Sequence, residues 1–336
     1  MFLIVIGHSI YNGVSNTPMD TVYSGGGGNF IIKSLLLLSH TAVNLYVMIT
    51  GYFLIEKTDF RWKGFVNVWC ITLFYSILSL LAFAIFQPVS LSFPNIVKSL
   101  LPVTTSQYWF ITTYLALLLL APYLSKLVSG LNKRQYAALI AILFVLSFEY
   151  PFGRLFAGNG FTLFWFVFLY LFAGYMRSFS LPEWIIKYRY VLLTLFFCVL
   201  LVPVLLTDAN VLNLRTLSHL LDNGYNGFVC FLSFIFFICF LNADMKGVVW
   251  ERIASFAVYT FGVYVIHENI LFRTFLWDSL KSMSSSIFGY IFLASISFVV
   301  MLFVDYFRQK LFKVLSVETM TSRLYTIICS TVNKRA

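Results

Sequence analysis

Apolar runs that are long enough, or nearly long enough, to cross a lipid bilayer recur along the whole of this 336-residue chain. A transmembrane helix needs about 20 predominantly apolar residues, because the hydrocarbon core is about 30 Å thick and a helix rises about 1.5 Å per residue. The sequence therefore predicts an all-α, polytopic membrane helix bundle of about ten transmembrane helices. The predicted spans are residues 2–14, 30–55, 64–87, 107–129, 136–148, 161–176, 189–207, 227–242, 254–276 and 286–304.

Composition excludes the soluble alternatives. Only 11% of the residues are charged, 60% are apolar, and the mean hydropathy is +0.87. Because an ordinary soluble domain has about 25% charged residues, a soluble enzyme and a disordered chain are both excluded. The five cysteines lack metal-binding spacing, so we expect neither a metal site nor a disulfide. The net charge of +10 suits the anionic headgroups of a lipid bilayer, and we expect no nucleic-acid partner.

No linker in the chain is long enough to separate two folded domains. We expect a transmembrane domain over residues 1–304 and a basic, amphipathic cytoplasmic tail over residues 305–336. The first span is short, like the outer part of a helix whose beginning is truncated. If the chain crosses the membrane from the cytoplasm to the outside in that span, 17 of the 23 lysines and arginines fall on the cytoplasmic side and five on the outside. This asymmetry predicts a multi-pass protein of the inner (cytoplasmic) cell membrane with its C-terminus in the cytoplasm.

Polar residues inside the predicted spans are site candidates, because ionisable groups are costly at membrane depth. His8 lies in the first span, directly after a glycine that lets another helix come close. In the second span, Lys33, His40, Asn44 and Gly51 are spaced by 7, 4 and 7 residues, which places them on one stripe of a helix.

A third polar face is expected in the ninth span. There Thr260, Tyr264, His267 and Glu268 share one side of a helix, and Glu268 is the only acidic residue that we place inside any span. Three polar faces in an apolar bundle predict a shared, hydrated interior, since lipid-facing groups of this kind would have no partner. Trp109, at the start of the fourth span, is expected either in an interfacial aromatic belt or beside this interior.

The motifs that are missing narrow the chemistry. The chain has no G-x-x-x-x-G-K-[ST] loop, no G-x-S-x-G elbow and no H-E-x-x-H motif. A histidine without a triad nucleophile suits the removal of a proton from a hydroxyl group. Together with cationic loops that bind a phosphorylated donor, this favours group transfer to a sugar hydroxyl.

Four stretches of the chain resemble the acyltransferase 3 family of integral membrane O-acyltransferases, and they occur in the family's order. FLIVIGHS resembles the end of the first helix with its histidine, and AVNLYVMITGYFL resembles the second helix. YWFITTYLALLLLAPYLSKLV resembles the helix with a W-F-x-x-x-Y…P pattern, and FGVYVIHENI resembles the Y-x-I-H signature of the penultimate helix.

The resemblance implies an O-acyltransferase (an O-acetyltransferase in most members) that uses acetyl-CoA or another acyl-CoA as a donor substrate, with no bound cofactor. The acceptor would be a carbohydrate or lipid-linked glycan of the cell envelope, capsule or exopolysaccharide. The first-helix histidine of the family, thought to be catalytic, corresponds to His8. The family's typical arginine, eleven residues earlier, would fall before Met1. Many members have an aspartate where this chain has Asn44.

On this hypothesis, His8 removes the proton from the acceptor hydroxyl, while Tyr264 and His267 hold the acceptor or stabilise the oxyanion. His40, Asn44, Trp109 and Glu268 would support substrate binding. The CoA phosphates would lie near four cations of the cytoplasmic loops: Arg61, Lys63, Lys133 and Arg134.

Two other functions stay open at this stage. A polysaccharide flippase or exporter also has a polar interior, but it is expected to show internal repeats with broken helices in matching positions, which this sequence lacks. A polysaccharide polymerase would favour a large outer loop, whereas the longest one expected here has about 19 residues. Tighter binding in the presence of acetyl-CoA would distinguish an acyltransferase from a flippase.

Overall fold

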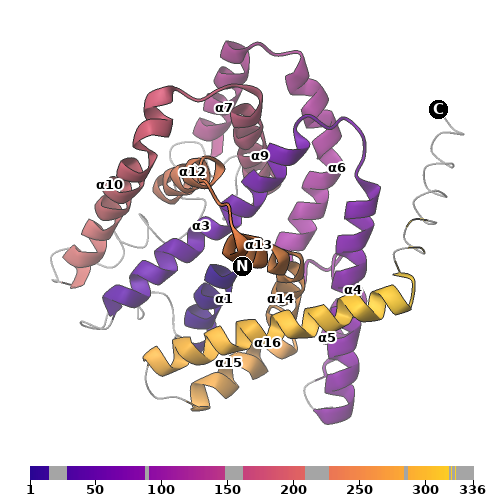
Figure 1. The fold of residues 1–336 in the computed structure, drawn as a ribbon. Helices are drawn as coiled ribbons and strands as arrows, with labels where there is room; N and C mark the ends of the chain where they lie inside the picture. The colour runs from indigo at the N-terminus through magenta and orange to yellow at the C-terminus, as the bar shows by residue number, and fades with distance from the viewer. Residues whose placement is uncertain are drawn as a thin grey trace, which may run out of the picture. The chain divides into compact units, whose positions relative to one another are not determined.

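The computed structural model describes residues 1–14, 29–87, 91–147, 162–208, 227–283, 287–317, 319 and 322. All regular structure within these residues is helical (Figure 1). Three features of the sequence lie outside them: the glycine run at 25–28, the connectors that hold Arg154 and Arg215, and the tail from Arg323 onward. The chain divides into two compact units.

Each of the ten predicted spans falls on a helix or on a run of consecutive helices. Among the described residues, six helical segments are long and apolar enough to cross a membrane: Phe30–Leu54, Trp62–Phe86, Trp109–Ser129, Glu183–Leu206, Val248–His267 and Phe288–Val314. The chain is therefore a multi-pass membrane protein. Shorter apolar helices cover Phe2–Asn12, Leu163–Ser178 and Val229–Leu241. Because these are short for a bilayer, the count of ten stays a prediction.

The unit formed by residues 2–59 and 119–245 is organised around one long helix. The central helix α3 (Asn29–Leu54) packs against α1 (Phe2–Ser9), α9 (Leu163–Ser178), α10 (Glu183–Asp208) and α12 (Gly227–Leu241) (Figure 1). Gly51 lets α3 approach α9 closely, since a Cβ there would collide with the backbone of Tyr170. Small residues at such crossings are typical of membrane helices. Helix α7 (Lys133–Ser147) packs on the same α9.

The unit formed by Met1, residues 60–118 and residues 246–336 contains the remaining helices. They are α4 (Trp62–Phe86), α5 (Phe93–Leu100), α13 (Val248–Phe256), α14 (Thr260–His267), α15 (Phe272–Met283) and α16 (Ile287–Val314). Helix α6 (Trp109–Ser129) begins in this unit and ends in the other one. Helix α14 contacts α4, α15 and α16, so it lies at the centre of its unit.

Two boundaries differ from the sequence-based expectation. A continuous ninth span over residues 254–276 is wrong: α14 ends at His267, residues 268–271 are not helical, and α15 is a separate helix. The physical reason is Asn269, whose side chain caps α15 and so competes with a continuous helix. The last helix runs to Val314 rather than 304, because the charge of Asp305 is paired with Arg308 inside it.

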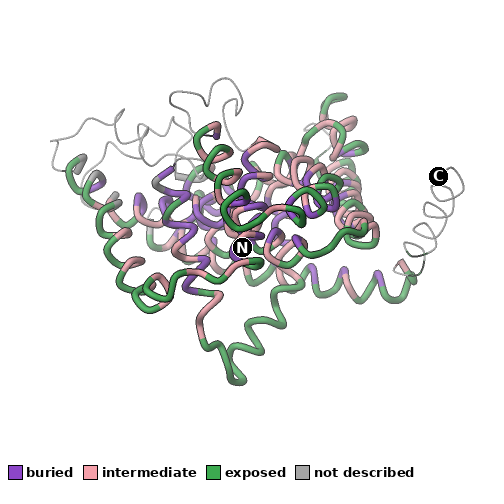
Figure 2. Tube along the Cα trace, turned by 90° about the horizontal axis from the view of Figure 1, so that it is seen from above, coloured by how far each residue is buried: buried purple, intermediate pink, exposed green. Residues whose placement is uncertain are grey.

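Much of the helical surface is apolar and exposed. Figure 2 shows long exposed stretches along the helices. Large apolar side chains such as those of Ile85, Leu195 and Phe292 are exposed. In water such a surface would aggregate, whereas in a bilayer it faces lipid chains. The exposed apolar faces therefore agree with the membrane assignment that helix length gives.

Candidate active site

His8 is positioned by the close packing of α1 on α3. Its neighbour Gly7 faces Ser39 of α3, and a Cβ at Gly7 would collide with the Ser39 side chain. A turn of π-helix (Ile10–Val14) follows α1, and within it Asn12 Nδ2 donates a hydrogen bond to the backbone oxygen of His8 (2.8 Å). The histidine itself is half-buried. The backbone around His8 is thus fixed on both sides, while part of its side chain stays accessible.

The α3 stripe divides into two kinds of residue. His40 is half-buried, whereas Asn44 is completely buried. Asn44 Nδ2 donates to Ser233 Oγ of α12 (3.1 Å), and Trp165 Nε1 of α9 donates to Asn44 Oδ1 (3.1 Å). The amide therefore links three helices, and these bonds account for a polar residue in an apolar core.

Two residues of the polar face predicted in the ninth span, Tyr264 and His267, contact each other in the structure. The Tyr264 and His267 rings meet edge to face with centroids 5.8 Å apart, and Phe110 packs on Tyr264 at 5.6 Å. Tyr108 lies 6.4 Å from Tyr264, between ring centroids. Trp277 of α15 packs on the other side of His267, at 6.2 Å. His267 thus lies in an aromatic environment at the end of α14.

The hydrogen bond of His267 fixes its tautomer. Its Nδ1 atom lies 2.7 Å from the carbonyl oxygen of Val263. Because a carbonyl only accepts, Nδ1 carries the proton, and in the neutral ring Nε2 is left with a lone pair. Such a nitrogen suits the acceptance of a proton or of a hydroxyl hydrogen bond.

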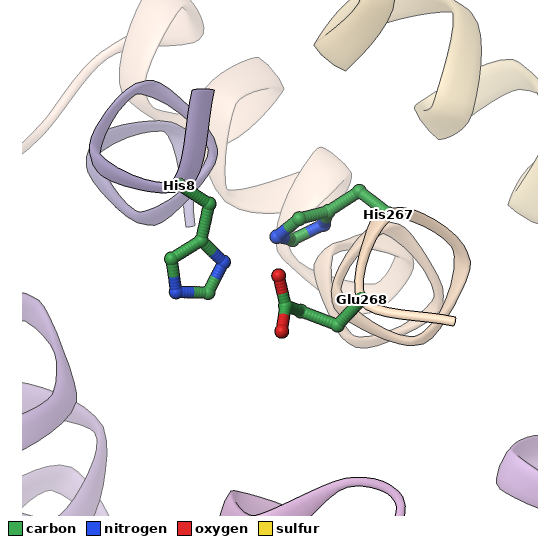
Figure 3. Close-up of side chains that lie close together, drawn as sticks. All are labelled: His8, His267 and Glu268. Carbon is green, nitrogen blue, oxygen red and sulfur yellow. The ribbon is translucent and has the colours of Figure 1, made fainter. Parts of the chain in front are cut away.

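Glu268 follows His267 but lies beyond the last helical residue of α14. Figure 3 shows the two side chains next to each other where this helix ends, and His8 on its own helix α1. Glu268 Oε2 is 3.5 Å from Arg273 Nη1 of α15, and the glutamate side chain is 11% exposed. The predicted neighbours His267 and Glu268 therefore both belong to the corner between α14 and α15.

Trp109 and its neighbour Tyr108 have different environments. Trp109 is 38% exposed, whereas Tyr108 is only 1% exposed and its hydroxyl accepts a hydrogen bond from Asn269 Nδ2 (2.9 Å). Tyr108 contacts Tyr264 and Asn269, whereas Trp109 packs edge to face on Phe110 with ring centroids 5.9 Å apart. The sequence-based prediction names Trp109 and selects neither Tyr108 nor Asn269, which is completely buried.

The four predicted phosphate-binding cations lie at the starts of helices. Arg61 occupies the position just before α4, and Lys63 lies in the first turn of this helix. Lys133 and Arg134 occupy the first turn of α7. All four are exposed, as an encounter with a soluble anionic donor requires.

Two charged residues that fall in the predicted tail, Asp305 and Arg308, are buried instead. Asp305 and Arg308 of α16 form a bidentate pair (2.8 and 2.9 Å), and the Tyr75 hydroxyl of α4 donates to Asp305 Oδ1 (2.9 Å). The expectation that Glu268 is the only acid inside a span is therefore wrong, since Asp305 lies within the membrane-capable segment Phe288–Val314. The D-x-x-R spacing, which pairs opposite charges on one helix face, was the available signal.

These features define a class: a multi-pass helical membrane protein with polar residues buried in its helical core. The model of the acyltransferase 3 family, an acyltransferase domain, matches residues 1–306 of the chain. The chain belongs to the acyltransferase 3 family, and it is an acyltransferase of the membrane. Neither a curated protein nor a solved structure shows significant similarity to it.

Proposed function

We propose that this protein is an O-acyltransferase of the cytoplasmic cell membrane that transfers an acetyl group from acetyl-CoA to a hydroxyl of an envelope or exopolysaccharide sugar. The observation that carries the proposal is the family match over residues 1–306, which includes His8. Membrane-capable helices agree with an acceptor such as a lipid-linked glycan, which is itself held at a bilayer. The C-terminus is assigned to the cytoplasm on the distribution of lysines and arginines.

His8 is the general base in this proposal. Its imidazole takes the proton from the acceptor hydroxyl, and the oxygen attacks the thioester carbonyl. The new C–O bond forms, the C–S bond breaks, and CoA leaves as the thiolate, which receives the proton from the imidazolium. The half-buried position of His8 and the fixed backbone around it support this role.

The other candidate residues are assigned supporting roles. Tyr264 and His267 bind the acceptor or stabilise the oxyanion of the tetrahedral intermediate. The hydrogen bond between His267 Nδ1 and the Val263 carbonyl holds the ring in place for this role. The exposed cations are assigned to the phosphates of the donor and are to be tested in two pairs, Arg61 with Lys63 and Lys133 with Arg134. Supporting contacts to substrate are assigned to His40, Asn44, Trp109 and Glu268.

The test uses the purified full chain in lipid nanodiscs with radiolabelled acetyl-CoA and a lipid-linked glycan extract. We expect acetyl transfer by the wild type, and a loss of at least about a hundredfold in the His8→Ala variant. Binding of acetyl-CoA, read as a rise in the thermal midpoint, should persist in that variant. His219→Ala is the matched control, because it removes a histidine that has no assigned role.

Undiminished transfer by His8→Ala would contradict the role of His8. If the wild-type protein shows neither acetyl transfer nor a rise in thermal midpoint with acetyl-CoA, the acetyltransferase proposal is contradicted and a flippase is favoured. A second experiment compares the acetylation of envelope glycans in cells with and without the protein. Equal acetylation in the two would contradict the proposal that envelope glycans are the acceptor.

A further inference from the structure

The corner between α14 and α15 is organised by a single buried side chain. Where one helix stops and another starts, backbone groups lose their helical partners and need others. Asn269 Oδ1 accepts hydrogen bonds from the backbone amides of Leu271 (3.0 Å) and Phe272 (3.3 Å), and its own carbonyl accepts from the amide of Arg273 (2.8 Å). Asn269 is therefore the N-cap of α15.

The same side chain is tied to a second segment of the unit. Asn269 Nδ2 donates to the Tyr108 hydroxyl (2.9 Å), so both ends of the amide are used. Asn269 is completely buried and Tyr108 is 1% exposed. A hydrogen bond between two buried groups is shielded from water, and its loss leaves a buried donor without a partner. The Asn269–Tyr108 bond therefore anchors the corner to the segment that leads into α6.

The corner carries two of the candidate residues of this unit. Glu268 directly precedes Asn269, and His267 is the last residue of α14. The ring of Tyr108 lies 6.4 Å from that of Tyr264, which in turn contacts His267. A shift of Asn269 would therefore change both the direction of the chain after His267 and the aromatic packing beside it.

We infer that Asn269 and Tyr108 form a positioning pair that sets the orientation of His267 and Glu268 for acyl transfer. The inference rests on the proposed function, because it requires His267 to take part in the reaction. Neither residue of the pair has to touch substrate. Small displacements of a catalytic group lower the turnover rate by up to about a hundredfold, whereas donor binding at other residues is unaffected.

The test compares Tyr108→Phe, Asn269→Ser and the double variant. Tyr108→Phe removes only the accepting hydroxyl. Asn269→Ser keeps an oxygen that caps α15 but is too short to keep the bond to Tyr108. We expect each single variant to lower kcat by about tenfold with an unchanged KM for acetyl-CoA, and the double variant to lose no more than either single one.

Tyr170→Phe is the matched control. It removes a hydroxyl that is also completely buried and that lies 3.2 Å from Ser125 Oγ, in the unit that does not contain His267. This variant should lower the thermal midpoint without lowering kcat. If Tyr108→Phe lowers only the thermal midpoint, the pair has a merely structural role and the inference is wrong.

Other outcomes separate the inference from the function on which it rests. If the wild type shows no acyl transfer, the proposed function itself is wrong. If the wild type is active and Tyr108→Phe has a normal kcat, only the inference about the positioning pair is wrong. Independent, multiplicative losses in the double variant would also overturn it, because the two residues would then not act through one bond. Because Tyr108→Phe keeps the ring and its packing, it remains informative if Asn269→Ser fails to fold.

Discussion

The carboxylate of Asp305, in α16, lies directly against the Cα of Gly262, in α14. A Cβ at position 262 would collide with Asp305 Oδ1 and Cγ. The carboxylate has little freedom to move, because Arg308 holds both of its oxygens and Tyr75 donates to one of them. This contact sets the distance between α16 and the helix that ends in His267.

Gly262→Ala should therefore destabilise the protein. The added methyl group forces α14 away from a carboxylate that is held in place, and overpacking of this kind costs about 1–3 kcal/mol. The thermal midpoint in detergent, followed by circular dichroism, measures the effect. Gly64→Ala is the control: a Cβ there meets nothing within 4 Å, so this variant should be neutral or slightly stabilising. Equal midpoints for both variants would contradict the close contact.

Asp305→Asn should lower the stability of the protein by more than this small change of side chain suggests. It leaves the guanidinium of Arg308, whose side chain is 6% exposed, without its charge partner. Removal of one partner from a buried ion pair costs about 3–5 kcal/mol, whereas replacement of both by apolar residues is often close to neutral. We expect the Asp305→Leu/Arg308→Leu double variant to recover much of the stability lost in Asp305→Asn. A double variant that unfolds more readily than the single one would argue against this explanation.

Asn44→Leu should loosen the link between α3, α9 and α12. It removes the hydrogen bonds to Ser233 and Trp165, at a total cost of about 1–3 kcal/mol. Ser233→Ala should lower the thermal midpoint by less, and it should have little further effect when Asn44 is already leucine. Ser295→Ala serves as the control, since the hydroxyl of Ser295 donates to the carbonyl of Ile291 in its own helix. Additive losses for Asn44 and Ser233 would show that the two residues act separately.

Gly7→Ala should affect both stability and acyl transfer. The new methyl group would meet the Ser39 side chain and push α1, which carries His8, away from α3. The Gly7→Ala/Ser39→Gly double variant removes the colliding atoms and should restore much of both properties. Transfer rates and thermal midpoints of the wild type and the two variants measure this rescue. A double variant no better than Gly7→Ala would mean that the contact with Ser39 does not position α1.

The sequence predicted the helical class and the positions of the helices well. Long apolar runs have few structural solutions, because backbone groups in a bilayer must be paired within the helix itself. The same reasoning failed at the ninth span, where it extended one helix through Asn269. Hydropathy does not register a side chain that caps the next helix, so the break after His267 was missed.

Candidate residues were predicted with similar limits. His8, Tyr264, His267 and Glu268 were selected because polar groups are rare in these runs, and the structure records Tyr264 and His267 in contact. The sequence-based prediction names Trp109, but in the structure the neighbouring Tyr108 is the buried residue of the two. Sequence does not show which of two adjacent aromatic side chains faces the core, because this depends on how the helix packs. The roles of all these residues in catalysis remain predictions.

The sequence by itself determined that this protein is a helical membrane protein and belongs to a family of acyltransferases. Both conclusions follow from composition and motif order, which are properties of the chain alone. Only the tertiary structure decided which polar residues are buried and what they bind. The sequence predicts that Asp305 begins a basic, amphipathic tail, because it follows the last apolar run. In the structure Asp305 is instead paired with Arg308 and Tyr75 in the core of its unit. The physical reason is that the cost of burying a charge depends on its partners, and partners as distant in sequence as Tyr75 and Asp305 are brought together only by folding.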